Sequence, residues 1–497
     1  MKTFYVTTPI YYVNGLPHIG HSYTTIAADV LSRHKRQRGW DVYFLTGTDE
    51  HGQKVLRAAQ EAGKTPQEFV DGIIPRFKET WKKLDISYDD FIRTTEARHI
   101  KAVGYFLQLL YDKGELTLGD YEGLYCVPCE VFWTEKQAEG GLCPDCKRPI
   151  ERIKESNYFF KLSRHQAWLL QYIKDNPDFI QPESRRNEVL SFLEENALTD
   201  LCVSRPRSRL SWGIPLPFSP DHVTYVWFDA LINYISALGY PADLKKFDAF
   251  WPSVLHLMGK DILRQHAVIW PIMLHAAGLP VPHRIFAHGW WQVGEEKMSK
   301  SRGNVVNPLD IIDEFGIDVY RYFLLRDVPF GLDGVFSREA LIKRFNGDLA
   351  NDLGNLVYRT LTMSEKYIDG RIPALRKDRA ASALGSSILA KLEKLSVSVD
   401  MALDKLDFIA ALQFVWDVIG DANKFVEETK PWNLKKEGKT EELEDFLSVM
   451  FLVLRQAAAE LAPFMPQTSA KILSQLKGDR VAKGEPLFPR IIVEDKG

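Results

Sequence analysis

The sequence predicts an α/β fold in which a parallel β-sheet is split by a cysteine-rich insertion and is followed by a C-terminal α-helical bundle. Three observations predict it. Short β-rich runs alternate with amphipathic helical patterns over the first hundred residues, a Gly-, Cys- and Pro-rich stretch interrupts this alternation, and helical periodicity dominates beyond about residue 336. Strands separated by helices form a parallel sheet with right-handed crossovers, so the first part is expected to be a split Rossmann-like parallel sheet. Ligands of such a sheet bind at the carboxyl ends of its strands.

The first half of the sheet is expected to contain strands at Phe4–Thr8 and Val42–Thr46. Amphipathic patterns predict that helices follow them over residues 22–38 and 51–62. The loops after Thr8 and Thr46 are therefore candidate ligand-binding loops.

The interruption runs from about Leu116 to Glu155, and its composition is expected to prevent long helices and clean strand alternation. It contains two C-x2-C pairs, a spacing that can present four thiolates tetrahedrally to zinc. Such a closed site leaves no position for a substrate, so the zinc-knuckle insertion is expected to be structural, with reduced free thiols as the alternative. The fifth cysteine, Cys202, is expected to be a small buried hydrophobic residue. The expected zinc ligands are Cys126, Cys129, Cys143 and Cys146.

After the insertion, the strand–helix alternation is expected to resume with strands at Thr224–Phe228, Val254–Met258 and Arg284–Ala287. Apolar residues at three- and four-residue spacings then predict a helical bundle. Its expected helices cover residues 349–363, 386–406, 409–428 and 440–461, and residues 430–439 are expected to form a solvated loop.

The chain has 497 residues, a formal net charge of -3, 45% hydrophobic residues and 26% charged residues, which is typical of a globular protein with several domains. The near-neutral charge excludes a generally basic nucleic-acid-binding coat, so any RNA contact must use local patches. The N-terminus lacks the pattern of a secretion signal, and Lys260, Asp261 and Arg264 interrupt the most apolar stretch. A cytoplasmic protein without transmembrane helices is therefore expected, and its clustered cysteines fit a reducing compartment.

The strongest chemical signal is PHIGH at residues 17–21, between a predicted strand and a predicted helix. The N–H groups and positive dipole end of a helix N-terminus attract phosphates, and Gly20 allows the backbone to come close. His18 and His21, three residues apart, can both point toward one triphosphate. The motif therefore indicates ATP binding, although an isolated match is more often a pair of ordinary surface or core histidines.

A second motif, KMSKS at residues 297–301, lies on a Gly-flanked loop after the last predicted sheet strand. Lys297 and Lys300 are flexible point charges that could pair with phosphate oxygens as charge develops. Two lysines in a polar loop are by themselves more often a solvated face. Together and in this order, the two motifs resemble the HIGH and KMSKS signatures of the class I aminoacyl-tRNA synthetases.

Within that class, the chain resembles the methionyl-tRNA synthetase family over essentially its whole length. Six stretches carry the likeness, in the expected order: TTPIYYVNGLPHIGH, FLTGTDEHG, YVWFDALINYISA, GKDILRQHAVIWP, FAHGWW and KMSKSRGN. The resemblance implies that methionine is activated with ATP, accompanied by Mg²⁺, and transferred to initiator and elongator tRNA(Met). It also implies a Rossmann catalytic domain in two halves at 1–115 and 201–292, a connective insertion with the zinc knuckle at 116–200, the KMSKS loop and stem-contact segment at 293–337, and an α-helical anticodon-binding domain at 338–497.

The resemblance also assigns site residues by position. Asp49 is expected to receive the ammonium group of the substrate and Arg205 to orient it, although Asp49 would serve equally well as a helix N-cap. An apolar, aromatic slot suits a polarizable thioether, although each aromatic residue taken singly is more often plain core. The expected methionine-binding residues are Ile10, Tyr12, Asp49, Arg205, Trp227, Ala230, Tyr234, Ile262 and His266. The expected ATP-binding residues are His18, Gly20, His21, Asp261, His288, Gly289, Lys297 and Lys300, of which His18, His21, Lys297 and Lys300 are expected to be catalytic.

In the helical bundle, Asn355 and Arg359 share one helix face, and Pro431 and Trp432 follow a later helix in a loop. The resemblance assigns all four to the anticodon, whereas Trp432 alone would be interpreted as a packing residue. The sequence ends without the OB-like module that dimerises many bacterial members, so a monomer, or a complex with a separate OB-fold tRNA-binding subunit, is expected. Two alternatives were weighed: a catalytically silent relative that binds tRNA or nucleotide, and a cysteinyl-type synthetase with thiolate ligands in its catalytic pocket.

Overall fold

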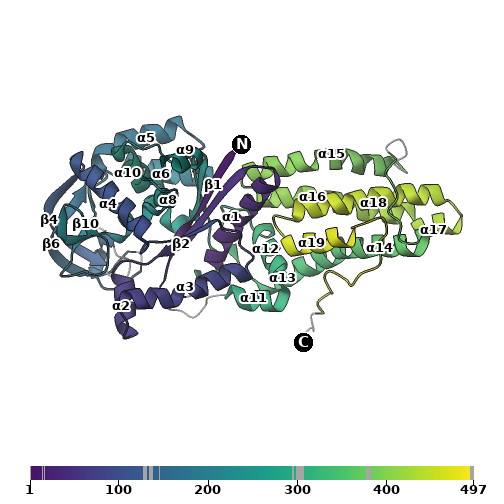
Figure 1. Ribbon diagram of the computed structural model, residues 1–497, viewed down its shortest axis with the longest axis horizontal. Coiled ribbons are helices and arrows are strands. Elements are labelled where there is room, and N and C mark those ends of the chain that lie inside the picture. The colour runs from purple at the N-terminus through teal and green to yellow at the C-terminus, as the bar shows by residue number, and fades with distance from the viewer. Residues whose placement is uncertain are drawn as a thin grey trace. The chain divides into compact units, whose positions relative to one another are not determined.

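The computed structural model describes residues 2–13, 15, 17–126, 131–133, 138–144, 146–293, 296–297, 307–376 and 382–492. They belong to two compact units, Met1–His288 and Gly289–Gly497 (Figure 1). Within these described ranges, no helix has both the length and the apolar character needed to cross a membrane.

The first unit is built on a six-stranded parallel sheet. Its first strand pairs with the second on one side, and on the other side its residues Tyr5–Thr7 pair with Val254–His256. A strand from before the insertion therefore lies directly beside one from after it, which confirms the split parallel sheet. The strand order is β3 (Asp90–Arg93), β2 (Asp41–Asp49), β1 (Thr3–Tyr12), β12 (Val254–Gly259), β13 (Arg284–His288) and β7 (Ile180–Gln181).

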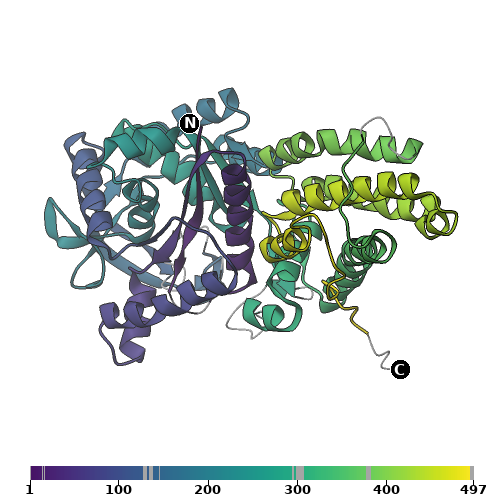
Figure 2. The same ribbon diagram turned by 45° about the vertical axis from the view of Figure 1, so that its right-hand side comes forward.

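Helices cover this sheet, because a parallel sheet must be buried on both faces. The first helix begins after the N-cap residue His18 and ends in a basic turn, which the negative end of the helix dipole favours. Figures 1 and 2 show it lying along β1 and β2. The helices of this unit that bear on the site are α1 (Ile19–Gln37), α2 (Gln53–Glu61), α4 (Ala97–Asp112), α7 (Val226–Leu231), α8 (Asn233–Ser236), the 3-10 turn η4 (Lys260–Ile262) and the π-helical turn η5 (Gln265–Ile269). The others include α3 (Pro66–Lys83), α5 (Gln166–Asp175), α6 (Glu183–Glu195), α9 (Leu244–Phe250) and α10 (Trp270–Ala277).

The prediction of a strand at Thr224–Phe228 is wrong. β11 (Ser219–Thr224) ends where that strand was expected to begin, and it pairs antiparallel with β9 (Ser204–Pro206) and β10 (Pro215–Leu216) in a separate small sheet. The following residues form α7 instead. A short apolar run such as VWF fits a buried strand and a buried helix equally well, so its periodicity could not decide between them.

The insertion contains longer strands than its composition predicted. β4 (Leu116–Cys126) and β6 (Glu151–Phe160) pair antiparallel, from Leu116 with Phe160 to Tyr125 with Glu151. The expectation that this stretch cannot sustain clean strand alternation is therefore wrong for these two strands. Backbone hydrogen bonds hold such a ladder whatever the side-chain pattern. The sheet is completed at its two edges by β5 (Val131–Trp133) and β8 (Leu201–Cys202).

The second unit is a helical bundle, as the apolar spacing predicted, and its three longest helices lie side by side in both views (Figures 1 and 2). Residues 430–439 are not a loop throughout. Lys430 ends one helix in the left-handed conformation, and Pro431 opens the next because the fixed φ of proline suits a first helical position. The described helices of this unit are α11 (Pro308–Phe315), α12 (Ile317–Arg326), α13 (Arg338–Arg344), the π-helical η7 (Phe345–Gly354), α14 (Asn355–Ile368), α15 (Ala383–Asp404), α16 (Phe408–Thr429), α17 (Pro431–Lys436), α18 (Thr440–Leu461) and α19 (Pro466–Gln475). The unit also contains the strands β14 (Trp291–Val293), β15 (Glu296–Lys297) and β16 (Gly334–Val335).

Candidate active site and metal centre

The candidate active site lies at the carboxyl ends of the central strands. β1 and β12 are neighbours, and the strand order runs from β1 toward β2 on one side and from β12 toward β13 on the other. A crevice outside such a switch point is where parallel α/β sheets bind ligands. Candidate residues from distant parts of the sequence end these strands: Tyr12 in β1, Asp49 in β2 and His288 in β13.

Two imidazole rings frame the N-terminus of α1. The Gly20 N–H donates a hydrogen bond to His18 Nδ1 at 3.1 Å, and the His18 N–H donates to His21 Nδ1 at 3.4 Å. Because both Nδ1 atoms accept, the hydrogen of each neutral ring must be on Nε2. The rings stack with their centroids 3.8 Å apart. Each side chain therefore caps the helix with Nδ1 and carries its N–H on Nε2.

Gly20 leaves space for these rings. A Cβ atom at this position would lie 3.0 Å from His18 Cε1 and 3.2 Å from His18 Nδ1. A larger residue would therefore push the His18 ring off the backbone N–H that it caps. The three residues of the motif act as one unit around the first turn of α1.

His288 lies beside α1, and Asp261 lies beside Gly259, the strand partner of His288. Thr24 Oγ1, one turn after Gly20, is 2.6 Å from His288 Nε2, and Gly259 pairs with His288 across the sheet. A Cβ atom on Gly259 would lie 2.6 Å from Asp261 Oδ1 and 3.8 Å from His288 Cε1. The Asp261 carboxylate therefore occupies the space that glycine leaves. The structure thus links the nucleotide candidates of the first unit through α1, β13 and the end of β12.

Thr24 and Gly259 were not among the residues predicted from the sequence. Thr24 follows Gly20 by four residues, so helical spacing alone could have placed the two on one face of α1. Gly259 ends the buried strand β12, and a glycine at a strand end is a signal of close approach by another group. Both residues act through others: Thr24 holds His288, and Gly259 makes room for Asp261.

The second motif lies largely outside the described residues. The backbone of Lys297 belongs to β15, where it pairs with Gln292, whereas Lys300 lies beyond the part of the chain that the structure describes. Gly289 belongs to the second unit, where a Cβ atom would lie 2.2 Å from the carbonyl oxygen of Leu332. The roles expected for Lys297, Lys300 and Gly289 toward ATP stay predictions.

An acidic residue and an aromatic pair meet at the same edge of the sheet. Tyr12 pairs with Asp49 in the β1–β2 register, and its ring meets the Trp227 ring edge-on with a centroid distance of 6.1 Å. Asp49 is buried and ends β2. The alternative role of Asp49 as a helix N-cap is wrong, because α2 starts only at Gln53 and its N-cap is Gly52.

A buried hydrogen-bond chain fixes the apolar wall next to these rings. Tyr234 Oη is 2.7 Å from His266 Nε2, and His266 Nδ1 is 2.9 Å from the carbonyl oxygen of Ile262. A carbonyl only accepts, so His266 carries its hydrogen on Nδ1 and accepts the Tyr234 hydroxyl hydrogen on Nε2. Burial lowers the pKa of His266 to about 4, which keeps the ring neutral near pH 7. Ala230 is buried on α7, and Ile10 is half-buried in β1.

Arg205 is buried in β9, between two aromatic rings. Its guanidinium carbon lies 5.1 Å from the centroid of Tyr125 and 4.8 Å from that of Tyr225, the residue before α7. Nη1 donates to the Ser204 carbonyl at 2.7 Å and to Cys202 Sγ at 3.2 Å. Cys202 is buried as expected, and it also acts as a hydrogen-bond acceptor for Arg205.

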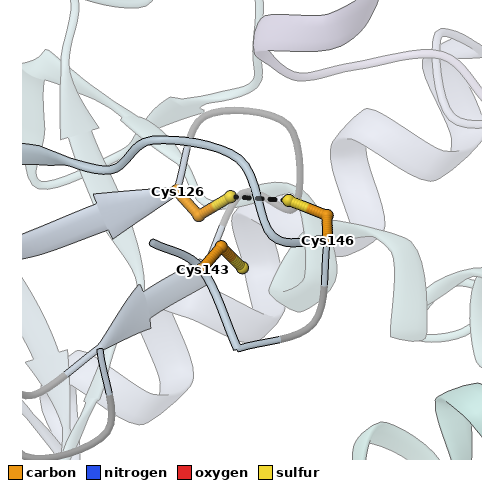
Figure 3. Close-up of side chains that lie close together, drawn as sticks. All are labelled: Cys126, Cys143 and Cys146. Atoms are coloured by element: carbon orange, nitrogen blue, oxygen red, sulfur yellow. Dashed lines mark hydrogen bonds between the residues drawn. The ribbon is translucent and has the colours of Figure 1, made fainter. Parts of the chain in front are cut away.

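The described cysteines of the insertion converge, and Figure 3 shows their sulfur atoms close together. The Sγ atoms of Cys126, Cys143 and Cys146 all lie within 4.8 Å of one another, and those of Cys126 and Cys146 are 3.5 Å apart. Tetrahedral Zn–S bonds of about 2.3 Å would hold sulfur atoms about 3.8 Å apart. The cluster could therefore bind a metal ion such as zinc. Cys129 lies outside the described residues.

The four candidate anticodon residues lie on two helices, α14 and α17. Asn355 begins α14 and Arg359 follows one turn later, which confirms their shared helix face. Arg359 Nη2 is 2.7 Å from Glu427 Oε1, near the C-terminus of α16. Pro431 and Trp432 open α17 directly after that helix, so the loop expected for them is wrong. The pairing of Arg359 with Glu427 thus joins α14 to the end of α16, the helix that directly precedes α17.

Comparisons with known proteins agree on one family. The model of the family "tRNA synthetases class I (M)" matches residues 4–153 and 148–361, and the "Anticodon-binding domain of tRNA ligase" matches residues 386–492. A methionine–tRNA ligase of Caldanaerobacter subterraneus subsp. tengcongensis is 51% identical over 99% of this chain and 80% of its own length, and that of Thermotoga maritima is 46% identical over 99% and 81%. The structure of Mycobacterium tuberculosis methionyl-tRNA synthetase in complex with methionyl-adenylate superposes with a TM-score of 0.93 and 40% identity, covering 99% of this chain and 100% of that one.

Proposed function

Because the chain belongs to the class I methionyl-tRNA synthetase family and is a methionine–tRNA ligase, we propose that the edge of the sheet around Asp49, Tyr234 and His21 is where its methionine and ATP react. Such a ligase joins methionine to AMP with release of pyrophosphate and then transfers methionine to the 3′ end of tRNA. One observation carries the proposal for the site: Tyr12 pairs with Asp49 and contacts Trp227. An acid beside aromatic rings suits an α-amino acid whose side chain is a thioether.

We assign the methionine ammonium group to the Asp49 carboxylate, with Arg205 as the residue that orients the site. His266 is neutral and uses both ring nitrogens, so it offers no charge to a ligand. A polar side chain placed against this wall would lose its hydrogen bonds to water without replacement, which disfavours polar amino acids. The thioether slot in this proposal consists of Ile10, Tyr12, Trp227, Ala230, Tyr234, Ile262 and His266.

We assign the triphosphate of ATP to the N-terminus of α1. There the Nε2–H donors of His18 and His21 add to the helix dipole, and Gly20 allows close approach. Asp261 is assigned to the ribose, and Mg²⁺ enters as part of the ATP substrate. The methionine carboxylate attacks the α-phosphorus in line with the leaving pyrophosphate, and positioning with charge stabilisation supplies most of the catalysis. The further nucleotide residues in the proposal are His288, Gly289, Lys297 and Lys300.

For tRNA we propose the domain organisation expected from the sequence, with residues 1–115 and 201–292 catalytic, 116–200 connective, 293–337 in contact with the stem and 338–497 reading the anticodon. What supports the last assignment is the ion pair of Arg359 with Glu427, which joins α14 to the end of the helix that directly precedes Pro431 and Trp432. Amide, guanidinium and indole groups suit unstacked bases, which are read by their edges and by stacking. Initiator and elongator tRNA(Met) share an anticodon, so we infer that both are substrates.

Amino-acid-dependent ATP–pyrophosphate exchange tests the proposal. With amino acids offered separately, we expect methionine to exceed leucine, isoleucine and cysteine by at least about 10²-fold in kcat/KM, near the upper end of what apolar contacts can discriminate. The same preparation is expected to charge both tRNA(Met) species. Exchange that does not require methionine, or that prefers cysteine or leucine, would overturn the specificity of the site. A protein that binds tRNA but catalyses neither step would match the catalytically silent alternative.

We further propose that the metal is zinc, that Cys129 is its fourth ligand, and that its role is structural. Four thiolates close the coordination shell, so the ion can hold the tip of the β4–β6 ladder in shape but cannot contact methionine or ATP. What supports this is the fit of the three described sulfur atoms to tetrahedral spacing.

Replacing Cys126 by serine is expected to reduce bound zinc from about one ion per chain to less than about one tenth, because a closed site loses one of its four thiolates. Elemental analysis of the purified protein measures this directly. Cys202→Ser is the matched control and is expected to keep the metal, since Cys202 contacts Arg205 rather than the cluster. Zinc retained by Cys126→Ser, or lost by Cys202→Ser, would contradict the assignment.

Two expectations from the sequence stay predictions. One is the cytoplasmic location. The other is the quaternary structure, a monomer or a complex with a separate OB-fold subunit, which size-exclusion chromatography with light scattering would decide.

A further inference from the structure

A fully buried carboxylate, Asp229, is at the centre of a hydrogen-bond chain that links four segments of the first unit. Its Oδ2 is 2.7 Å from His51 Nδ1, and its Oδ1 is 2.7 Å from His99 Nε2. His99 Nδ1 is in turn 2.9 Å from Ser236 Oγ. Asp229, His99 and Ser236 are each at most 1% exposed. The chain of contacts therefore runs from α7 to the segment after β2 in one direction, and through α4 to α8 in the other.

The hydrogen positions in this chain follow from the carboxylate. Burial by itself raises the pKa of Asp229, but the charge and hydrogen bonds of His51 and His99 outweigh burial and hold the pKa below its ordinary value. An ionised carboxylate only accepts, so each histidine donates the N–H that faces it. Both oxygens of Asp229 are thus satisfied by charge-assisted hydrogen bonds in a region that excludes water.

Three of these four segments carry the proposed methionine site: the one after β2, α7 and α8. His51 follows Asp49 by two residues, and Asp229 lies on the same short helix as Trp227 and Ala230. Ser236 lies on α8 with Tyr234. The loop after Asp49 is held a second time by Trp212, whose Nε1–H donates to the carbonyl of Glu50 at 2.6 Å.

We propose that Asp229 is a positioning residue for methionine: it sets the separation between the acid that receives the ammonium group and the aromatic wall that receives the thioether. This inference rests on the roles proposed above for Asp49 and Trp227. The carboxylate does not touch the substrate in this scheme. Asp229 matters in this scheme because a substrate with two anchor points needs both at a fixed distance. A displacement of about 1 Å in such a site can lower the reaction rate about 10²-fold.

Steady-state exchange kinetics of Asp229→Ala test the proposal. We expect the methionine KM to rise about 10- to 100-fold while the ATP KM changes less than about threefold. The ATP candidates of the first unit lie on or before α1, in η4 and at the end of β13, whereas the hydrogen bonds of Asp229 go to His51 and His99. Asp229→Asn is expected to retain part of the function, since its amide oxygen can still accept from one of the two histidines.

The matched control is Glu115, a second buried carboxylate of the same unit. Its Oε2 is 3.2 Å from His165 Nε2 and its Oε1 is 2.9 Å from Arg164 Nη1. Glu115→Ala is expected to lower thermal stability without a selective change in the methionine KM. An equal methionine-selective effect in Glu115→Ala would overturn the positioning role of Asp229, because it would show a general response of the core.

His51 provides a second test that does not remove the central carboxylate. Asparagine can place an N–H near the position of His51 Nδ1, so His51→Asn is expected to recover most of the methionine KM that His51→Ala loses. Failure of this rescue in folded protein would contradict the proposal, and so would parallel changes in the two KM values.

A double-mutant cycle separates this inference from the proposed function. Once Asp49 is replaced by asparagine, the ammonium anchor is gone and its separation from the wall no longer matters. The added effect of Asp229→Ala on the methionine KM is then expected to be less than about threefold. If the methionine KM of the double variant rises by the full product of the two single-variant effects, the proposal is wrong. Absence of methionine-dependent exchange in the unaltered protein would instead refute the proposed site function.

Discussion

Replacing Asp49 by asparagine raises the methionine KM in ATP–pyrophosphate exchange by about 30- to 3,000-fold and leaves the ATP KM within about threefold. The range corresponds to about 2–5 kcal/mol for leaving one partner of a buried charge pair unpaired, at about 1.4 kcal/mol per tenfold. Asp49 is 2% exposed, so water cannot take the place of the carboxylate as the partner of the ammonium group. Asparagine keeps the shape of the side chain, so the β1–β2 pairing at Tyr12 is preserved.

Asp41 offers the matched control for this experiment. It begins the same strand at the opposite edge of the sheet and is exposed. Asp41→Asn is expected to leave both KM values unchanged. An Asp49→Asn enzyme that loses rate but not methionine affinity would show that the carboxylate serves the chemical step rather than ammonium binding.

The second large effect concerns the two nitrogens of His21, which have different roles. Nδ1 accepts the His18 N–H, whereas Nε2 carries the N–H that we assign to phosphate. Loss of a donor that stabilises developing charge costs about 2.7–4 kcal/mol, or about 10²–10³-fold in kcat. We therefore expect His21→Asn, which can keep an acceptor near Nδ1 but has no group at the Nε2 position, to lose about that much rate with little change in the methionine KM.

His21→Gln is the complementary variant, because its amide reaches the position of Nε2 but leaves the His18 N–H without its acceptor. It is expected to retain at least about tenfold more kcat than His21→Asn, and to lose about 1 kcal/mol of stability for the missing cap. Single-turnover formation of the adenylate measures the first quantity, and denaturant unfolding measures the second. Equal rates for the two variants would contradict a catalytic role for Nε2.

The parallel sheet could be predicted because its strands are short apolar runs separated by clear helical patterns. Phe4–Thr8, Val254–Met258 and Arg284–Ala287 all lie within observed strands for that reason. The errors arose where local pattern is ambiguous. Thr224–Phe228 is apolar without a decisive period, and β4 and β6 are held by backbone pairing across residues far apart in sequence.

The candidate site was predictable only as a set of residue types and strand ends. Sequence motifs identified His18, His21 and Asp49, but they could not show that Thr24 holds His288 or that Asp261 fills the space beside Gly259. The first contact joins α1 to β13 across 264 positions of the sequence, and the second matters because Gly259 pairs with His288 in the neighbouring strand. The same is true of Asp229, which would be taken for an ordinary helix residue until His51 and His99 are placed beside it.

The neighbouring placement of β1 and β12 has a consequence for biosynthesis. At about 5–20 residues per second, a ribosome needs on the order of tens of seconds to progress from the end of β1 at Tyr12 to the start of β12 at Val254. During that interval the nascent β1–β2 pair exposes an unsatisfied backbone edge to which other polypeptides could add strands. We expect the emerging chain to depend on chaperone protection until β12 is synthesised, and translation pauses within the intervening segment to lower the yield of native enzyme.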